Sequence, residues 1–183
     1  MARIPYFDPA KATGRAAEAY KKLPKLNIFK MLGHSGDMLD AFTKFGNVIL
    51  MHSDLDPILR EIAIVRVGVL KKGKYEVHQH ERISRQIGMS EDKIKAIHEG
   101  PEAAAFSELE KMVMRFTDDI VANTRASDAT FNPLMEKLPV KQVQELVIAI
   151  GFYTAVCYFL ETFDVDIEEK GKEPTVNLSG KKA

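Results

Sequence analysis

Apolar residues recur along most of the chain at three- and four-residue intervals, which is the spacing of one face of an α-helix. No run alternates between apolar and polar residues with turn residues at both ends, so no strand is expected. The pattern predicts helices at 14–22, 28–33, 36–51, 57–72, 74–87, 91–99, 102–123, 128–138 and 139–164. The chain is therefore predicted to be all-α.

These helices are predicted to form a single domain, 1–183, whose core spans about 35–165. Residues 1–12 contain two prolines that restrict the backbone, so they are expected to form an extended arm. Residues 167–183 are charged and contain glycines, which is typical of a frayed tail. The 183 residues, 45% of them hydrophobic, are enough to bury a substantial core.

Charge and composition exclude several classes of partner. The 26 basic and 26 acidic residues cancel, and no basic patch interleaved with aromatics occurs, so a nucleic-acid partner is not expected. The N-terminus has no pattern of a secretory signal, and the longest uncharged run, 146–160, is shorter than the roughly 20 residues of a spanning helix. We expect a cytoplasmic protein with no membrane partner, in which 146–160 is a buried helix and the lone Cys157 an inert core thiol.

The helix at 57–72 begins with strong signals and is apolar on nearly every side. Asp56 is a good N-cap and Pro57 suits the first helical position. A helix that is apolar all round is packed on several faces. The charges of Arg60, Glu61 and Arg66 point in three directions, and Glu61, which has mainly apolar helical neighbours, is the one expected inside the protein. A buried carboxylate needs a partner or a proton.

The helix after Gly73 places Glu76 and His80 on its apolar face, together with Ile83 and Ile87. Residues four apart lie one turn apart, so the Glu76 carboxylate and the His80 imidazole can touch. Such a pair fits proton transfer, because burial and mutual charge tune both pKa values. A structural His–Glu contact in the core is the alternative, and the pattern leaves both open.

The same residues resemble a known motif. Glu61, Lys74-Tyr75-Glu76 and His80 are similar to the central motif of the carboxymuconolactone decarboxylase family, in the alkylhydroperoxidase D-like superfamily. The resemblance implies an all-α, alkylhydroperoxidase D-like fold. In the redox branch of that superfamily the motif is a Glu, eleven residues, Cys-x-x-Cys, three residues and a His. The two thiol positions correspond here to Gly73 and Glu76, so the resemblance points away from disulfide peroxidase chemistry.

The resemblance also implies a function. The implied protein is a cofactor-free lyase or isomerase that moves protons on a small carboxylated lactone or related organic acid. The carbonyl of that substrate would be the electron sink. Glu61 or Glu76 would be the acid or base, His80 its partner, and Tyr75 a hydrogen-bond donor to a developing oxyanion. Two further residues are candidates for substrate binding, His52 in a loop and Tyr153 in a helix that resembles the closing helix of the family.

There are three alternatives to the lyase function, and an oligomeric assembly is also expected. The chain could be a non-catalytic binding or assembly module that retains the fold, or an alkylhydroperoxidase-type peroxidase, which the absent thiols disfavour. A metal site on His78 and His80 is not expected, because the two side chains point about 200° apart on a helix. The resemblance and the apolar surplus of the helices after Ser35 and Pro139 favour a homo-oligomer, either a trimer or a hexamer.

Overall fold

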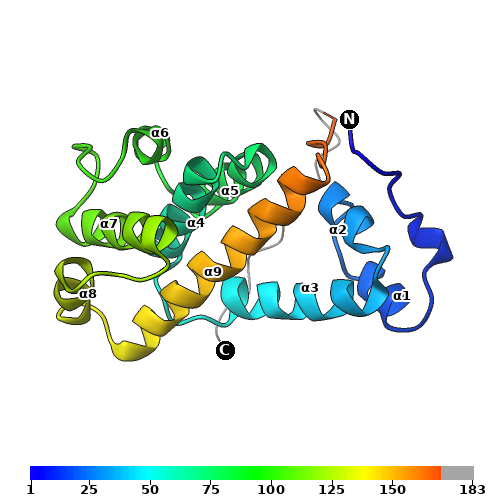
Figure 1. Cartoon of the computed structure of the whole chain (residues 1–183), viewed down its shortest axis with the longest axis horizontal. Coiled ribbons are helices and arrows are strands. Elements are labelled where there is room, and N and C mark those ends of the chain that lie inside the picture. The colour runs from blue at the N-terminus through cyan, green and yellow to red at the C-terminus, as the bar shows by residue number, and fades with distance from the viewer. Residues whose placement is uncertain (170–183) are drawn as a thin grey trace. The chain divides into compact units, whose positions relative to one another are not determined.

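A computed structural model describes residues 1–169 of the chain, and within these residues every regular element is helical (Figure 1). The elements are a 3-10 turn η1 (Pro9–Lys11) and the helices α1 (Gly14–Tyr20), α2 (Asn27–Leu32), α3 (Gly36–Met51), α4 (Pro57–Leu70), α5 (Lys74–Gln86), α6 (Glu91–Glu99), α7 (Glu108–Asn123), α8 (Asp128–Met135) and α9 (Val140–Thr162). The all-α prediction is confirmed.

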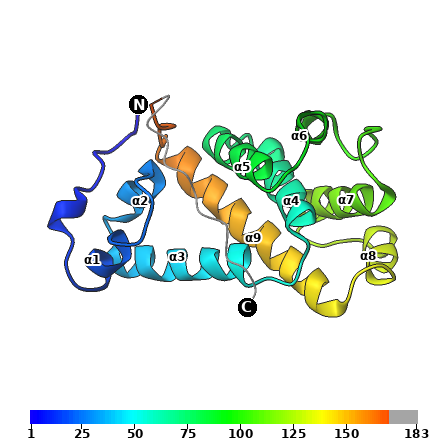
Figure 2. The ribbon, with the colours of Figure 1, turned by 180° about the vertical axis from the view of Figure 1, so that it is seen from behind.

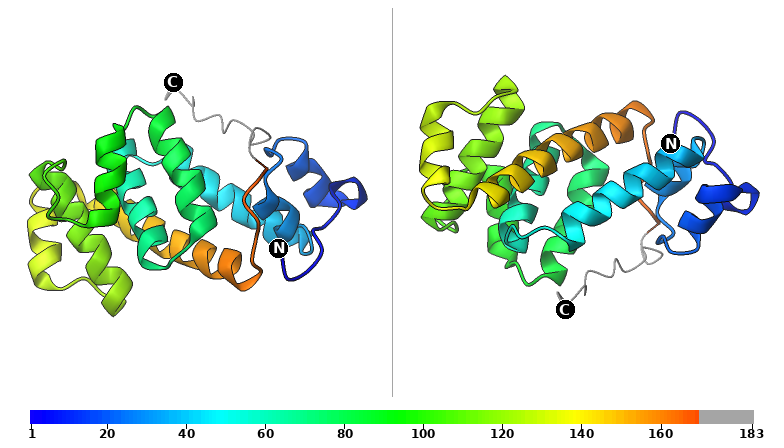
Figure 3. Two further views of the ribbon diagram at one scale, coloured as in Figure 1. Left: turned by 90° about the horizontal axis from the view of Figure 1, so that it is seen from above. Right: turned by 90° about the horizontal axis from the view of Figure 1, so that it is seen from below.

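The chain forms two compact units. The first comprises Met1–His52 together with the segment from Leu160 on, and the second comprises Ser53–Phe159. In the first unit α1 and α2, blue in Figure 3, pack against the cyan helix α3. Its buried side chains begin before the predicted core at about residue 35, because these short helices each bury one face: Ala16, Leu26, Ile28, Met31 and Leu32. The prediction of a single domain stays a prediction.

The predicted N-terminal arm is tied to the segment after α9. The α-amino group of Met1 lies 3.0 Å from Asp166 Oδ1, and the Tyr6 hydroxyl donates to Asp166 Oδ2 at 3.1 Å. Glu168, within the predicted tail, is buried and accepts a hydrogen bond from the Asn27 backbone N–H at 2.7 Å. The described start of that tail is therefore packed, and 170–183 lie outside the described residues.

Helix α4 is the centre of the second unit. It packs against α5, α6 and α7, and α7 also contacts α8 (Figure 2). The prediction that α4 is enclosed on several faces is confirmed, because five apolar residues in its middle have no exposed surface: Ile62, Ala63, Ile64, Val65 and Val67.

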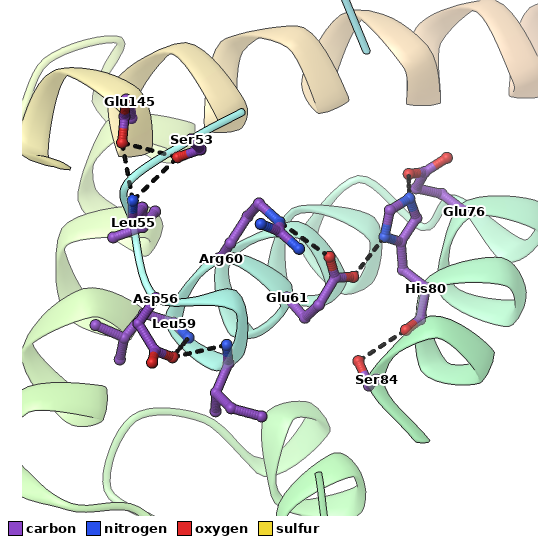
Figure 4. A network of polar contacts seen from close by, with 11 residues as sticks. Ser53, Leu55, Asp56, Leu59, Arg60, Glu61, Glu76, His80, Ser84 and Glu145 are labelled. Carbon is purple, nitrogen blue, oxygen red and sulfur yellow. Dashed lines mark hydrogen bonds and ion pairs between the residues drawn. The ribbon is translucent and has the colours of Figure 1, made fainter. Parts of the chain in front are cut away.

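The start of α4 is fixed by two carboxylates. Asp56, the predicted N-cap, accepts hydrogen bonds from the backbone N–H groups of Ile58 and Leu59, at 2.8 and 3.2 Å. Such a cap stabilises a helix by about 1 kcal/mol. Just before it, Glu145 of α9 accepts hydrogen bonds from the Ser53 hydroxyl and the Leu55 N–H, at 2.7 and 2.9 Å (Figure 4). The chain therefore enters α4 in a fixed position against α9.

Helix α7 begins six residues later than its apolar pattern predicts. Ser107 and Glu110 form a capping box, in which the Ser107 hydroxyl accepts from the Glu110 N–H and the Glu110 carboxylate accepts from the Ser107 N–H at 2.8 Å. Gly100 has a φ of 116°, which the helix cannot contain, and the chain between Gly100 and Ser107 forms turns. The predicted start at residue 102 is wrong because the capping box of Ser107 and Glu110 begins the helix at Glu108, and the helical pattern before it is weak.

Helix α9 has two apolar faces. One is buried and includes Leu146, Ala149 and Ile150, whereas Ile148 and Tyr158 are 48% and 58% exposed on the other. The prediction of a fully buried helix is therefore wrong for one face. By length and composition α9 could also cross a membrane, a property that the core helices of soluble proteins share.

Candidate active site

The His80 imidazole of α5 lies between two carboxylates, and one of them comes from α4. Its Nδ1 is 2.6 Å from Glu61 Oε2, and its Nε2 is 3.0 Å from Glu76 Oε1 (Figure 4). Glu61 has no exposed surface, and Glu76 and His80 are 3% and 6% exposed. The sequence reasoning placed Glu76 and His80 on one buried face and Glu61 inside, and the structure brings all three together.

The two contacts of His80 differ in quality. The contact with Glu61 is an aligned hydrogen bond, whereas the contact with Glu76 has the distance of an ion pair without the alignment of a hydrogen bond. Within the described residues, the buried Oε1 atom of Glu76 therefore has no hydrogen-bond partner. A buried acceptor without a partner marks a place where a ligand, a proton or a water belongs.

A second cation stands beside Glu61. Arg60, the preceding residue of α4, is 4% exposed, and its Nε lies 3.3 Å from Glu61 Oε1. Figure 4 shows Arg60 and His80 on either side of the Glu61 carboxylate, so both oxygens of this carboxylate are occupied. The sequence reasoning treated Arg60 only as one of three diverging charges and did not assign it to the site.

The pKa of His80 is raised from 6.5 to about 10. Burial alone would lower it, but the charges of Glu61 and then Glu76 outweigh the loss of hydration. The imidazole is therefore protonated at neutral pH. The reasoning from sequence had His80 pairing with only one carboxylate, but the ring bridges both because its two nitrogens point in opposite directions.

The other predicted residues are placed as follows. The Tyr153 ring of α9 meets the His80 ring edge to face, with centroids 4.7 Å apart. Burial, followed by the charges of Glu76 and Glu61, raises the pKa of Tyr153 well above its usual 10, and Arg60 partly opposes this shift. Tyr75 is buried in the first turn of α5. His52 is the C-cap residue of α3 and belongs to the first unit, whereas the other predicted residues belong to the second.

Two glycines allow helices to approach closely, Gly68 between α4 and α5 and Gly73 between α5 and α9. A Cβ on Gly68 would lie 2.9 Å from Val77 Cγ2, and a Cβ on Gly73 would lie 2.9 Å from the sulfur of Cys157. Gly73 is the N-cap residue of α5, and Glu76 follows one turn later. The only cysteine, on α9, therefore fills the space that a side chain at position 73 would take.

A separate cavity of about 560 Å³ lies near the N-terminal ends of α4, α6 and α7. Its walls include Asp56, Leu59, Ser90, Lys93 and Glu110. None of the six predicted site residues lines this cavity, and Lys93 and Glu110 already form an ion pair at 2.6 Å.

Several solved structures share this fold. An uncharacterised peroxidase-related protein from Ralstonia eutropha JMP134, described as an alkylhydroperoxidase AhpD core, is 19% identical with a TM-score of 0.79, and the alignment covers 95% of this chain and 98% of that one. An uncharacterised peroxidase-related protein from Silicibacter sp. TM1040 is 16% identical with a TM-score of 0.78, covering 92% and 95%. A variant of the debrominase Bmp8 in complex with 2,3,4-tribromopyrrole is 16% identical with a TM-score of 0.71, covering 82% and 80%. At these identities the likeness is one of fold.

The model of the carboxymuconolactone decarboxylase family matches residues 36–119. Over these residues the chain is similar to the carboxymuconolactone decarboxylase family, and its fold is like that of AhpD-like proteins. The matched segment contains Glu61, Tyr75, Glu76 and His80, whereas Tyr153 lies beyond it. No curated protein sequence matches the chain significantly.

Packing at the start of α5 gives the first prediction. Gly73→Ala should lower the free energy of unfolding by roughly 1–3 kcal/mol, because the new methyl group collides with the Cys157 sulfur. The double variant Gly73→Ala/Cys157→Ala should recover most of that loss, and Cys157→Ala alone is the control that completes the cycle. Denaturant unfolding measures all three, and additive losses in the double variant would contradict the contact.

The raised pKa of His80 gives the second prediction. The folded protein holds a proton on His80 up to a pH of about 10, whereas the unfolded chain loses it near 6.5. The contribution of His80 to stability is therefore complete below pH 6.5 and is lost as the pH rises towards 10. The difference in unfolding free energy between wild type and His80→Gln should shrink across this range. A difference that stays constant between these pH values would contradict the ion-pair arrangement.

Proposed function

We propose that this protein is a cofactor-free lyase or isomerase of the carboxymuconolactone decarboxylase type, which acts in the cytoplasm by proton transfer on a small carboxylated lactone or related organic acid. The observation that carries the proposal is the His80 imidazolium held between Glu61 and Glu76. A proton donor and a proton acceptor in direct contact inside a buried site are what such chemistry requires.

The three residues have different capacities in this mechanism. Both oxygens of Glu61 already accept hydrogen bonds, so Glu61 holds and orients the imidazole and compensates its charge. Glu76 keeps a buried oxygen without a hydrogen-bond partner, so it is the carboxylate that can accept a proton. His80 is protonated at neutral pH and is the group that can donate one.

In a decarboxylation, the bond between the substrate carbon and its carboxylate breaks, carbon dioxide leaves, and the electron pair moves onto the carbonyl of the substrate. His80 then gives its proton to the enolate and is reprotonated from solvent. In an isomerisation, Glu76 removes a proton next to the carbonyl, and His80 returns one at another carbon. Tyr75 is proposed to stabilise the oxyanion, and His52 and Tyr153 to bind the substrate.

A non-catalytic binding or assembly module is the rival function. The same burial favours it, because Glu61 has no exposed surface and its charge is compensated on both sides. A structural network of this kind would stabilise the fold without turning over a substrate. A peroxidase of the alkylhydroperoxidase type is a weaker candidate, because Gly73 and Glu76 stand where the resemblance places its thiols.

A substrate screen distinguishes the proposed catalytic function from the non-catalytic binding or assembly function. Lactones and carboxylated lactones are incubated with wild type, and active substrates are retested with His80→Ala and Glu61→Gln. Loss of the proton donor should reduce kcat roughly 10²–10⁴-fold while the helical circular dichroism is retained. His98→Ala is the matched control, since this exposed imidazole also pairs with a glutamate, Glu81. Turnover that survives in His80→Ala would refute the mechanism.

We also propose that the protein assembles as a homo-oligomer, a trimer or a hexamer. Apolar side chains are exposed on two helices of the described chain, and such surfaces commonly mark subunit contacts: Met38, Phe45 and Val48 on α3, and Val140, Val147, Ile148 and Tyr158 on α9. Light scattering should return three or six times 20.5 kDa, and Ile148→Glu should shift the protein to smaller species. A mass of 20.5 kDa at micromolar protein would contradict this assembly.

A further inference from the structure

Arg60 is almost fully buried and yet uses little of its hydrogen-bonding capacity. A guanidinium has five N–H donors. Within the part of the chain that the structure describes, the only hydrogen bond of the Arg60 side chain is from Nε to Glu61 Oε1, at 3.3 Å (Figure 4). Its two terminal nitrogens, Nη1 and Nη2, make none to the described residues. Four N–H donors of a 4% exposed cation are therefore left for another partner.

Arg66, two turns later on α4, shows what a structural arginine looks like in this protein. Its Nε and Nη2 donate to the two carboxylate oxygens of Asp118 at 2.7 and 2.8 Å, and its Nη1 donates to the Ile97 carbonyl at 3.0 Å. All three nitrogens are occupied, as expected for a cation that fixes neighbouring helices. The incomplete bonding of Arg60 is therefore specific to its position and is not a general feature of arginines in α4.

Two more groups near His80, the Tyr153 hydroxyl and Glu76 Oε1, have hydrogen-bonding capacity that no described residue uses. The Tyr153 hydroxyl makes no hydrogen bond to a described residue, although the residue is only 4% exposed. Arg60 is close enough for its charge to act on this hydroxyl. Glu76 Oε1 is the third such group. Leaving a buried acceptor such as Glu76 Oε1 without a hydrogen-bond partner is costly, so this atom, together with the unused donors of Arg60 and Tyr153, indicates a place built for a ligand.

We propose that the Arg60 guanidinium, assisted by the Tyr153 hydroxyl, binds the carboxylate of a small organic acid at the His80 site. The inference rests on the substrate class of the proposed function and names the residue that recognises it. The planar fork of a guanidinium matches the two oxygens of a carboxylate. Arg60 and protonated His80 balance the carboxylates of Glu61 and Glu76, so the site accepts one further negative charge more readily than two. This balance favours a monocarboxylate end over a doubly charged phosphate.

Binding of simple acids tests this inference without requiring turnover. The probes are monocarboxylates from acetate to benzoate and the matching uncharged amides, titrated by calorimetry. Wild type should bind its best acid at least tenfold more tightly than the amide, because a charge-assisted hydrogen bond is lost with the charge. Arg60→Gln should abolish this preference, Arg60→Lys should weaken acid binding because the fork is lost, and Tyr153→Phe should weaken it several-fold.

Arg115→Ala is the matched control, since this exposed arginine of α7 pairs with Glu102 and should leave binding unchanged. If Arg60→Gln does not fold, Arg60→Lys and Tyr153→Phe still decide the matter, because both keep the charges that surround Glu61. Equal binding of acid and amide by wild type, or unchanged acid binding in Arg60→Lys and Tyr153→Phe, would overturn the assignment.

The result also separates this inference from the proposed function. Acid binding that depends on Arg60, without turnover of any lactone or acid, would uphold the carboxylate site and refute the lyase. Turnover of an acid or lactone that is unchanged in Arg60→Lys and Tyr153→Phe would uphold the lyase and refute the carboxylate site.

Discussion

The burial of the Glu61 carboxylate is the constraint on which the second unit depends. A carboxylate without exposed surface must be compensated, and here the positive charges come from Arg60 of the same helix and His80 of the next. Since His80 is protonated by this arrangement, it requires a second negative charge, which Glu76 supplies one turn away. The register between α4 and α5 is thus fixed by charge as well as by apolar packing.

Close packing makes this charge arrangement possible. Helices α4 and α5 approach each other where Gly68 meets Val77, and α9 approaches α5 where the Cys157 sulfur meets Gly73. Larger side chains at either glycine would move the helices apart and lengthen the contacts of His80, which are short enough for direct proton transfer. The Cys157 sulfur therefore packs against Gly73, one of the two positions where the resemblance to the redox branch places a thiol.

Patterns within one helix were predictable from the sequence, and relations between helices were not. The four-residue spacing of Glu76 and His80 placed them together, and the apolar neighbours of Glu61 placed it inside, because both inferences need only helical geometry. The burial of Arg60 could not be read in this way, since a helical wheel shows the direction of a side chain but not which helix covers it. The exposed face of α9, where Tyr158 lies, escaped prediction for the same reason, because an apolar pattern does not distinguish a core from a subunit surface. The burial of Arg60 had one available signal in the sequence, which was its position directly before Glu61, a carboxylate already predicted to be buried.

The comparison of Arg60 with Arg66 shows where functional information lies in this fold. The two residues share a helix, a charge and a low exposure. All three side-chain nitrogens of Arg66 donate hydrogen bonds to described residues, whereas only one nitrogen of Arg60 does. The fold does not distinguish them, since solved structures that share it are named for different chemistries. What distinguishes them is the balance of donors and acceptors. A fold can leave a buried polar group unmatched at little net cost only where a ligand or water completes it, so the unmatched Glu76 oxygen and the unused donors of Arg60 locate the site more specifically than the fold does.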